Sequence, residues 1–279
     1  MKTEPSDIVD ATNRSGFPFQ MAVADLVRRT SNHTRCSVLF AEHSWTDSAG
    51  QYSGFIDLVV ANDVKPYVFV IECKRHAGAW AFLKAAEGRS ARGRRHAKLF
   101  AHDVDHMKGR IRQSGWVDAP LEPASIESSF CVVYRQDKDN PMLERLGAEL
   151  VQATECLARE DNFRVLATNQ SECLYAPVIV TNVKLMVAEF SPEDIDVETG
   201  KLKDAANVNE YEAPFVRFRK QLSFLRPDDD RKIFENDLYR LDYAKERTVF
   251  IVQAKHLQDF LGRFEVDGGW QISMRQPIP

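Results

Sequence analysis

Two acidic residues and a lysine stand out because they interrupt or close strongly apolar runs. Asp57 lies within the run 53–60, and Glu72 and Lys74 close the run 67–74. Both runs are short, rich in β-branched and aromatic residues and bounded by turn formers, which predicts buried strands. An unpaired charge in such a place costs several kcal/mol unless an ion partner or a metal compensates it. We therefore expect chemistry at these positions.

The spacing of these residues suits a cation site. Residues two apart on a strand share a face, so Glu72 and Lys74 project the same way. If their strand pairs with that of Asp57, both carboxylates converge on one hard cation, and the backbone carbonyl of Cys73 adds an oxygen ligand. Mg²⁺ accepts one or two carboxylates and keeps positions for water and phosphate, and Mn²⁺ is expected to substitute. Lys74 could orient or deprotonate a water, or neutralise the transition state as an ammonium, and the residues leave these roles open.

The elements that must position this site form a pattern of helix followed by strands. Apolar spacing predicts a helix over 19–30, then a three-stranded meander over 35–45, 54–60 and 67–74, and a further strand at 129–134. Later expected elements are a helix from about 140 to 160, strands within 175–190, at 215–220 and at 248–252, and a helix with an apolar stripe over 257–264. No low-complexity linker divides the chain, which favours one extended domain.

A basic segment follows the acid-x-lysine sequence directly. Residues 74–112 contain 11 Lys or Arg against three acids, and the densest part, 88–96, has no apolar period, which indicates a loop that could neutralise phosphates. A solvated charged loop is the alternative, and adjacency to the acid-x-lysine sequence disfavours it. Arg217 and Arg219 alternate on a later strand, where they contact nucleic acid or form a solvated strand face. The candidate nucleic-acid contacts are Arg75, Arg89, Arg92, Arg94, Arg95, Arg217 and Arg219.

The order Ile56-Asp57, fourteen intervening residues and then Glu72-Cys73-Lys74 resembles the PD-(D/E)xK, or restriction-endonuclease-like, nuclease superfamily. The leading helix, three strands, a helical or irregular segment and a fourth strand correspond to that superfamily's αβββαβ core. The resemblance covers residues 16–135. It implies an α/β fold with a mixed sheet, flanked by helices, in which residues 136–279 form an α+β extension packed on the core.

The resemblance also implies roles for the matching residues. Asp57 and Glu72 would be metal ligands, and Lys74 the catalytic lysine. Where many members place a glutamate on the first helix this chain has Gln20, and Glu42 is a candidate for the missing acid. The implied function is a Mg²⁺-dependent nuclease that cleaves phosphodiester bonds of nucleic acid, preferably DNA, by metal-activated water attack. The alternative is an inactive restriction-like fold that binds nucleic acid or protein.

A second strand end imitates the acid-x-lysine sequence. Gln253, Ala254 and Lys255 follow the apolar run 248–252, but an amide supplies no anionic ligand. We therefore interpret this copy as a structural strand end.

Composition favours an ordinary protein of the cytoplasm. The 279 residues are 44% hydrophobic and 28% charged, and no apolar run approaches the roughly 20 residues of a membrane helix. Residues 1–14 lack the apolar segment of a signal peptide. The five cysteines are odd in number and form no C-x-x-C pair, which predicts reduced thiols. A homodimer is expected if both strands of a duplex are cut, because that generally requires two sites.

Overall fold

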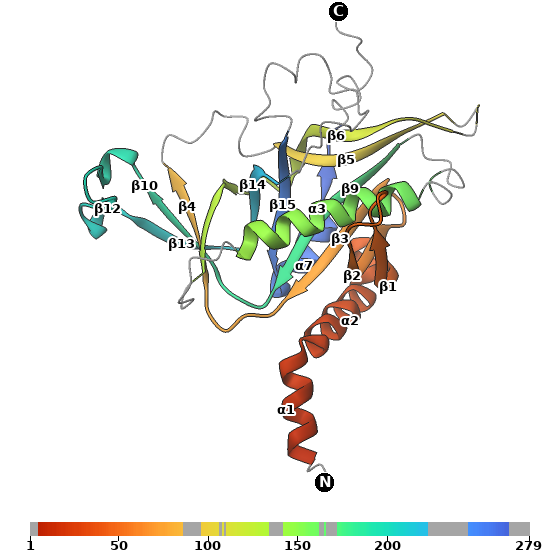
Figure 1. Ribbon diagram of the computed structural model, residues 1–279, viewed down its shortest axis with the longest axis horizontal. Coiled ribbons are helices and arrows are strands. Elements are labelled where there is room, and N and C mark those ends of the chain that lie inside the picture. The colour runs from red at the N-terminus through yellow and green to blue at the C-terminus, as the bar shows by residue number, and fades with distance from the viewer. Residues whose placement is uncertain are drawn as a thin grey trace, which may run out of the picture.

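The computed structural model describes residues 5–85, 96–105, 108, 110–133, 142–161, 165, 172–222 and 245–267. Within these residues the chain is a mixed α/β protein: helices cover a ten-stranded mixed sheet, and a four-stranded sheet lies beside it (Figure 1). The predicted α/β class with a mixed sheet is confirmed. No helix in this part of the chain has the length and apolar character needed to span a membrane.

The first part of the large sheet is an antiparallel meander entered from a helix. α2 (Phe17–Thr34) begins after Gly16, whose φ of 84° is a left-handed conformation that glycine adopts without steric cost. β1 (Cys36–Thr46), β2 (Ser53–Asn62) and β3 (Tyr67–Lys74) follow, each antiparallel to the next. The predicted helix and three-stranded meander are confirmed.

Beyond β3 the sheet continues with parallel strands. β9 (Glu172–Thr181) pairs with β3 along the whole of β3, and β15 (Glu246–Gln253) runs in the same direction beside β9. α3 (Met142–Glu160) precedes β9 in the chain and packs across these strands. β14 (Phe215–Gln221) and β7 (Ile126–Ser128) complete this side of the sheet.

The segment between β3 and α3 differs from the prediction of a helical or irregular region ending in a fourth core strand at 129–134. Its described residues form β4 (Trp80–Ala85), β5 (His96–Asp105), β6 (Arg110–Glu122), β7 and β8 (Phe130–Val133). β8 pairs with β4 in the smaller sheet, so β9 is the strand beside β3. The strand predicted at 129–134 therefore does not lie beside the meander. β5 was not predicted from the sequence because the polar side chains of Lys98 and His102 interrupt its apolar run. Both side chains are nevertheless buried.

The remaining described elements lie at the ends of the chain and in its second half. They are α1 (Pro5–Ser15), β10 (Leu185–Phe190), η2 (Pro192–Asp194), β11 (Ile195–Asp196), β12 (Lys201–Leu202), η3 (Ala205–Asn207), β13 (Asn209–Ala213), η4 (Ala254–His256), α7 (Leu257–Arg263) and β16 (Glu265–Val266). β10 and β13 belong to the smaller sheet, whose order is β13-β10-β4-β8. In Figure 1, α1 extends from α2 away from the large sheet.

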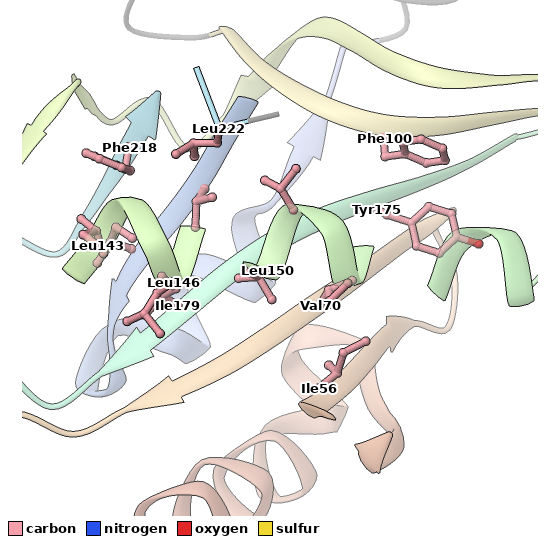
Figure 2. Close-up of a cluster of buried hydrophobic side chains, with 14 of the residues drawn as sticks. Ile56, Val70, Phe100, Leu143, Leu146, Leu150, Tyr175, Ile179, Phe218 and Leu222 are labelled. Atoms are coloured by element: carbon pink, nitrogen blue, oxygen red, sulfur yellow. The ribbon is translucent and has the colours of Figure 1, made fainter. Parts of the chain in front are cut away.

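Apolar side chains cover both faces of the large sheet. On one face α3 places Leu146 and Leu150 over the sheet beside Val70 (Figure 2). On the other face, α2 and α7 cover a second cluster, in which the rings of Phe69 and Phe260 meet edge to face. Burying each such side chain contributes about 1.5–3 kcal/mol. Apolar side chains therefore pack against both faces of β3 as far as Ile71, directly before Glu72.

Candidate active site

Asp57 and Glu72 lie on neighbouring strands, at the end of the pairing between β2 and β3. The register between β2 and β3 ends at the pair Leu58↔Ile71, and Asp57 and Glu72 are the residues that follow this last pair on the two strands. β3 is buried through Ile71 and half-buried from Glu72 to Lys74. The three predicted catalytic residues therefore meet where a buried strand pair reaches the surface.

The Asp57 side chain is turned toward β3. Its Oδ2 accepts a hydrogen bond of 2.7 Å from the backbone N–H of Cys73. Within the described residues, Asp57 Oδ1, the Glu72 carboxylate and the Lys74 ammonium have no hydrogen-bond partner. A half-buried ionisable group that lacks a hydrogen-bond partner is costly to keep charged. Such groups cluster at functional sites.

Negative charge at this carboxylate pair is incompletely balanced. The pKa of Glu72 is raised to about 7, first by burial and then by the charge of Asp57, while the charge of Lys74 opposes the rise. Burial also raises the pKa of Asp57, against the hydrogen bond from Cys73. The charge of Glu42 raises both pKa values further. A cation between the carboxylates would remove the electrostatic part of this cost, so the residues present fit a cation site.

Two further side chains reach Asp57 from α2 and β1. Gln20 of α2 is buried, and its Nε2 donates hydrogen bonds to Glu42 Oε1 and, at 3.0 Å, to the backbone carbonyl of Asp57. Glu42 falls opposite Asp57 in the β1–β2 register and is exposed. Its backbone has φ of 54°, a left-handed conformation that is uncommon for a residue with a side chain. The structure thus brings Glu42 near the carboxylate pair, and its role as a metal ligand stays a prediction.

The environment of Cys73, at the centre of the acid-x-lysine sequence, disfavours the thiolate form. Burial raises the pKa of the Cys73 thiol, so that the thiol stays protonated. All five cysteines are free, as the sequence predicted. The backbone carbonyl of Cys73 as a metal ligand stays a prediction.

Arg217 and Arg219 were predicted to lie on an exposed strand face, in contact with nucleic acid or with solvent, and this prediction is wrong. Arg217 is fully buried and donates to the Ser125 hydroxyl at 3.0 Å and the Ser125 carbonyl at 2.7 Å. Arg219 is 8% exposed and forms ion pairs with Asp118 at 3.2 Å and Glu246 at 3.1 Å. β14 is covered on both faces, so its polar alternation serves an internal network and neither arginine is available to a phosphate.

The other predicted nucleic-acid contacts divide into two groups. Arg75 directly follows Lys74 and is exposed at the end of β3. Arg89, Arg92, Arg94 and Arg95 lie outside the described residues. Arg75 is therefore the one member of the predicted set that the described residues place at the surface beside the carboxylate pair.

Sequence reasoning missed a contact that fixes the chain just beyond Arg75. Asn182, the first residue after β9, accepts a hydrogen bond from the His76 backbone N–H at 2.9 Å and donates one to the His76 carbonyl at 3.2 Å. The sequence feature that could have indicated this contact is a polar residue directly after a buried strand. This contact ties the exit of the acid-x-lysine strand to its parallel neighbour.

The segment Gln253-Ala254-Lys255, which imitates the acid-x-lysine sequence, has the structural role predicted for it. Gln253 is buried, and its Nε2 donates to the backbone carbonyl of Ala213 at 2.7 Å. Lys255 pairs with Glu212 at 2.7 Å. Its interpretation as a structural strand end is confirmed.

The donor set limits what kind of cation could bind. Within the described residues, no group of three or more His, Cys, Asp or Glu side chains is arranged to hold a metal ion. Mg²⁺ needs no such cage, because it accepts one or two carboxylates and completes its shell with water and phosphate oxygens. Comparisons with protein-family models, curated proteins and solved structures found no match to this chain. Functional inference therefore rests on the site itself.

Proposed function

We propose that the chain is a divalent-cation-dependent nuclease that hydrolyses phosphodiester bonds, preferably in DNA. One observation carries the proposal: the Asp57 side chain contacts the backbone of Cys73, between Glu72 and Lys74, so that two half-buried carboxylates lie near one lysine and the pKa of Glu72 is about 7. Phosphodiester hydrolysis requires positive charge at the phosphate and an activated water. The expected cofactor is Mg²⁺, for which Mn²⁺ should substitute.

The residues of the site divide this work. Asp57 and Glu72 would bind the cation, with the Cys73 carbonyl as a further oxygen ligand. The bound cation would stabilise charge at the phosphorus and acidify a water. The hydrogen bond from Cys73 N–H fixes one Asp57 oxygen and leaves the other for coordination. The Lys74 ammonium can then hydrogen-bond the water or a phosphate oxygen, and Arg75 can contact the nucleic-acid backbone.

The order of elements supports the proposal. The helix α2, the meander β1–β3, the helix α3 and the parallel strand β9 follow the order that the restriction-endonuclease-like resemblance implies, with a β-rich insertion before α3. The preference for DNA over RNA rests on that resemblance. A homodimer and a cytoplasmic location remain predictions.

A binding module without activity is the alternative. The observation that favours it is Gln20, which occupies the helix position where the resemblance implies an acid. Such a module would bind nucleic acid without cutting it, and its binding would not depend on a divalent cation.

Cleavage assays separate these functions. Purified protein with Mg²⁺ or Mn²⁺ is incubated with duplex, single-stranded and branched DNA and with RNA. We expect cleavage of at least one substrate, and a loss of about 10²-fold or more in Glu72→Gln and in Lys74→Met. Lys255→Met is the matched control, because this lysine also follows a buried strand but pairs with Glu212. Binding of the panel without cleavage would assign the chain to the inactive module.

A further inference from the structure

The histidine that follows Arg75 has a ring whose tautomer is fixed by the main chain. His76 Nδ1 accepts a hydrogen bond of 2.9 Å from the backbone N–H of Gly78. Because a backbone N–H can only donate, Nδ1 is the unprotonated nitrogen, and the proton of the neutral ring lies on Nε2. His76 therefore presents an N–H donor at Nε2.

This donor is open to a ligand. Within the described residues, Nε2 of the half-buried His76 has no hydrogen-bond partner, and it is not one of the buried side-chain atoms that lack a partner. The Lys74 and Arg75 side chains, directly before it, also have no hydrogen-bond partner in this part of the chain. Three successive side chains thus carry donors for which the described fold supplies no acceptor. Phosphate oxygens are acceptors of the kind that such donors bind.

The main chain at His76 is held by a separate contact. The pairing of β3 with β9, whose ends lie side by side in Figure 1, reaches Lys74↔Thr181. Asn182 continues it with its side chain, which accepts from the His76 N–H at 2.9 Å and donates to the His76 carbonyl at 3.2 Å. Ring and main chain are therefore both fixed before a ligand arrives, which lowers the entropy cost of binding.

We propose that His76 binds the backbone of the nucleic acid, with Nε2–H donating to a phosphate next to the one at the carboxylate pair. This inference rests on the proposed function. His76 lies at most about 7 Å along the chain from Lys74, which places it within reach of a neighbouring phosphate. The neutral ring neutralises no phosphate, so its contact adds affinity without the counterion release that a lysine or arginine contact causes.

Binding of fluorescein-labelled duplex and single-stranded DNA to the full chain tests this role. Fluorescence anisotropy is measured with Mg²⁺ at pH 8 in a Glu72→Gln background, in which cleavage is expected to be lost. His76→Asn keeps an acceptor for the Gly78 N–H, because asparagine accepts from the N–H two residues on, but it has no donor at the place of Nε2. We expect about tenfold weaker binding. His33→Asn, the same substitution at an exposed histidine near the end of α2, is the matched control.

The salt dependence distinguishes a neutral donor from a charged one. Arg75→Met should lower the slope of log K against log salt by about one, since it removes a charge that neutralises a phosphate. His76→Asn should weaken binding and leave this slope unchanged. A slope lowered as much as in Arg75→Met would contradict a neutral donor at His76.

A second substitution separates the two ring nitrogens. The amide of His76→Gln reaches the place of Nε2 but gives up the acceptor at Nδ1, so this variant should bind DNA more tightly than His76→Asn. The reverse order would show that the turn to Gly78 matters and the donor does not. Urea unfolding checks that each variant is folded.

The binding measurement is independent of cleavage, so this inference and the proposed function can fail separately. If the wild type cuts DNA and His76→Asn binds it as tightly as His33→Asn, the role of His76 is wrong and the nuclease stands. If the wild type binds DNA without cutting it, the nuclease is wrong, and weaker binding by His76→Asn still supports the contact. Absence of DNA binding in the Glu72→Gln parent would overturn the contact.

Discussion

Two groups of charged side chains lie on the large sheet, and they differ in how their charge is balanced. Around Arg219, the acids Asp118 and Glu246 form ion pairs with the guanidinium, and Glu127 lies 3.9 Å from it. Around Glu72, the carboxylate of Asp57 adds like charge, and the single nearby lysine forms no ion pair within the described residues. In the first group Arg219 and Glu246 are buried and Asp118 and Glu127 are half-buried, whereas the second group is half-buried throughout.

The pKa shifts show the physical meaning of this difference. The acids around Arg219 raise its pKa, against the effect of burial, which indicates that the guanidinium is stabilised as a cation. At the carboxylate pair, burial and like charge both raise the pKa of Glu72, which indicates that the folded chain alone does not stabilise its ionised form. Charge balanced inside the fold supports the architecture, whereas charge left unbalanced at an accessible edge suits binding of an external cation.

The largest expected effect comes from breaking the balanced group. Arg219→Met should lower the free energy of unfolding by about 3–5 kcal/mol, because it removes the guanidinium that pairs with the buried Glu246 and the half-buried Asp118. Urea denaturation at pH 7 measures this change. Arg75→Met, which removes an exposed arginine, should stay within about 0.5 kcal/mol of wild type. An equal effect of the two substitutions would show that the buried network contributes no more than a surface charge.

The unbalanced group should respond in the opposite direction. The folded pKa of Glu72, about 7, exceeds its ordinary value of 4.5, so the folded state binds more protons than the unfolded state between these pH values. Stability should therefore fall as pH rises through that window. Glu72→Gln should flatten this part of the profile and stabilise the cation-free protein by about 1–3 kcal/mol at pH 8.

Urea denaturation of wild type and Glu72→Gln from pH 4 to pH 8, without divalent cation, measures this effect. Added Mn²⁺ should recover part of the stability that the wild type loses above pH 7 and leave Glu72→Gln nearly unchanged. Parallel pH profiles for the two proteins would contradict an unbalanced charge at Glu72.

The smallest expected effect isolates the backbone at Glu42. Glu42→Gly and Glu42→Ala both remove the carboxylate and its hydrogen bond with Gln20, so their difference reports the left-handed conformation. The glycine variant should be more stable by about 0.5–1 kcal/mol, because alanine keeps the steric conflict of a Cβ at positive φ. Thermal or urea unfolding compares them. Greater stability of the alanine variant would mean that this backbone is not strained.

The sequence predicted the local parts of this arrangement better than the distant ones. The strands of Asp57 and Glu72 were recognised because their apolar runs are continuous, and short turns then determine which strand pairs with which. The partnership of Gln20 with Glu42 could not be predicted, because it depends on how α2 packs across the sheet. Arg217 and Arg219 were misassigned since alternation on a strand does not reveal whether its polar face meets water or buried acids.

The pairing of β3 with β9 has a consequence for synthesis of the chain. Tyr67 of β3 lies beside Leu174, roughly 100 residues later in the sequence. At translation rates of about 5–20 residues per second, β3 waits roughly 5–20 s for this neighbour. Throughout that interval one edge of the apolar strand that ends in Glu72 has no native partner, and such edges pair readily with other chains. The strand that carries Glu72 and Lys74, two of the predicted catalytic residues, is therefore open to such pairing while the next part of the chain is made.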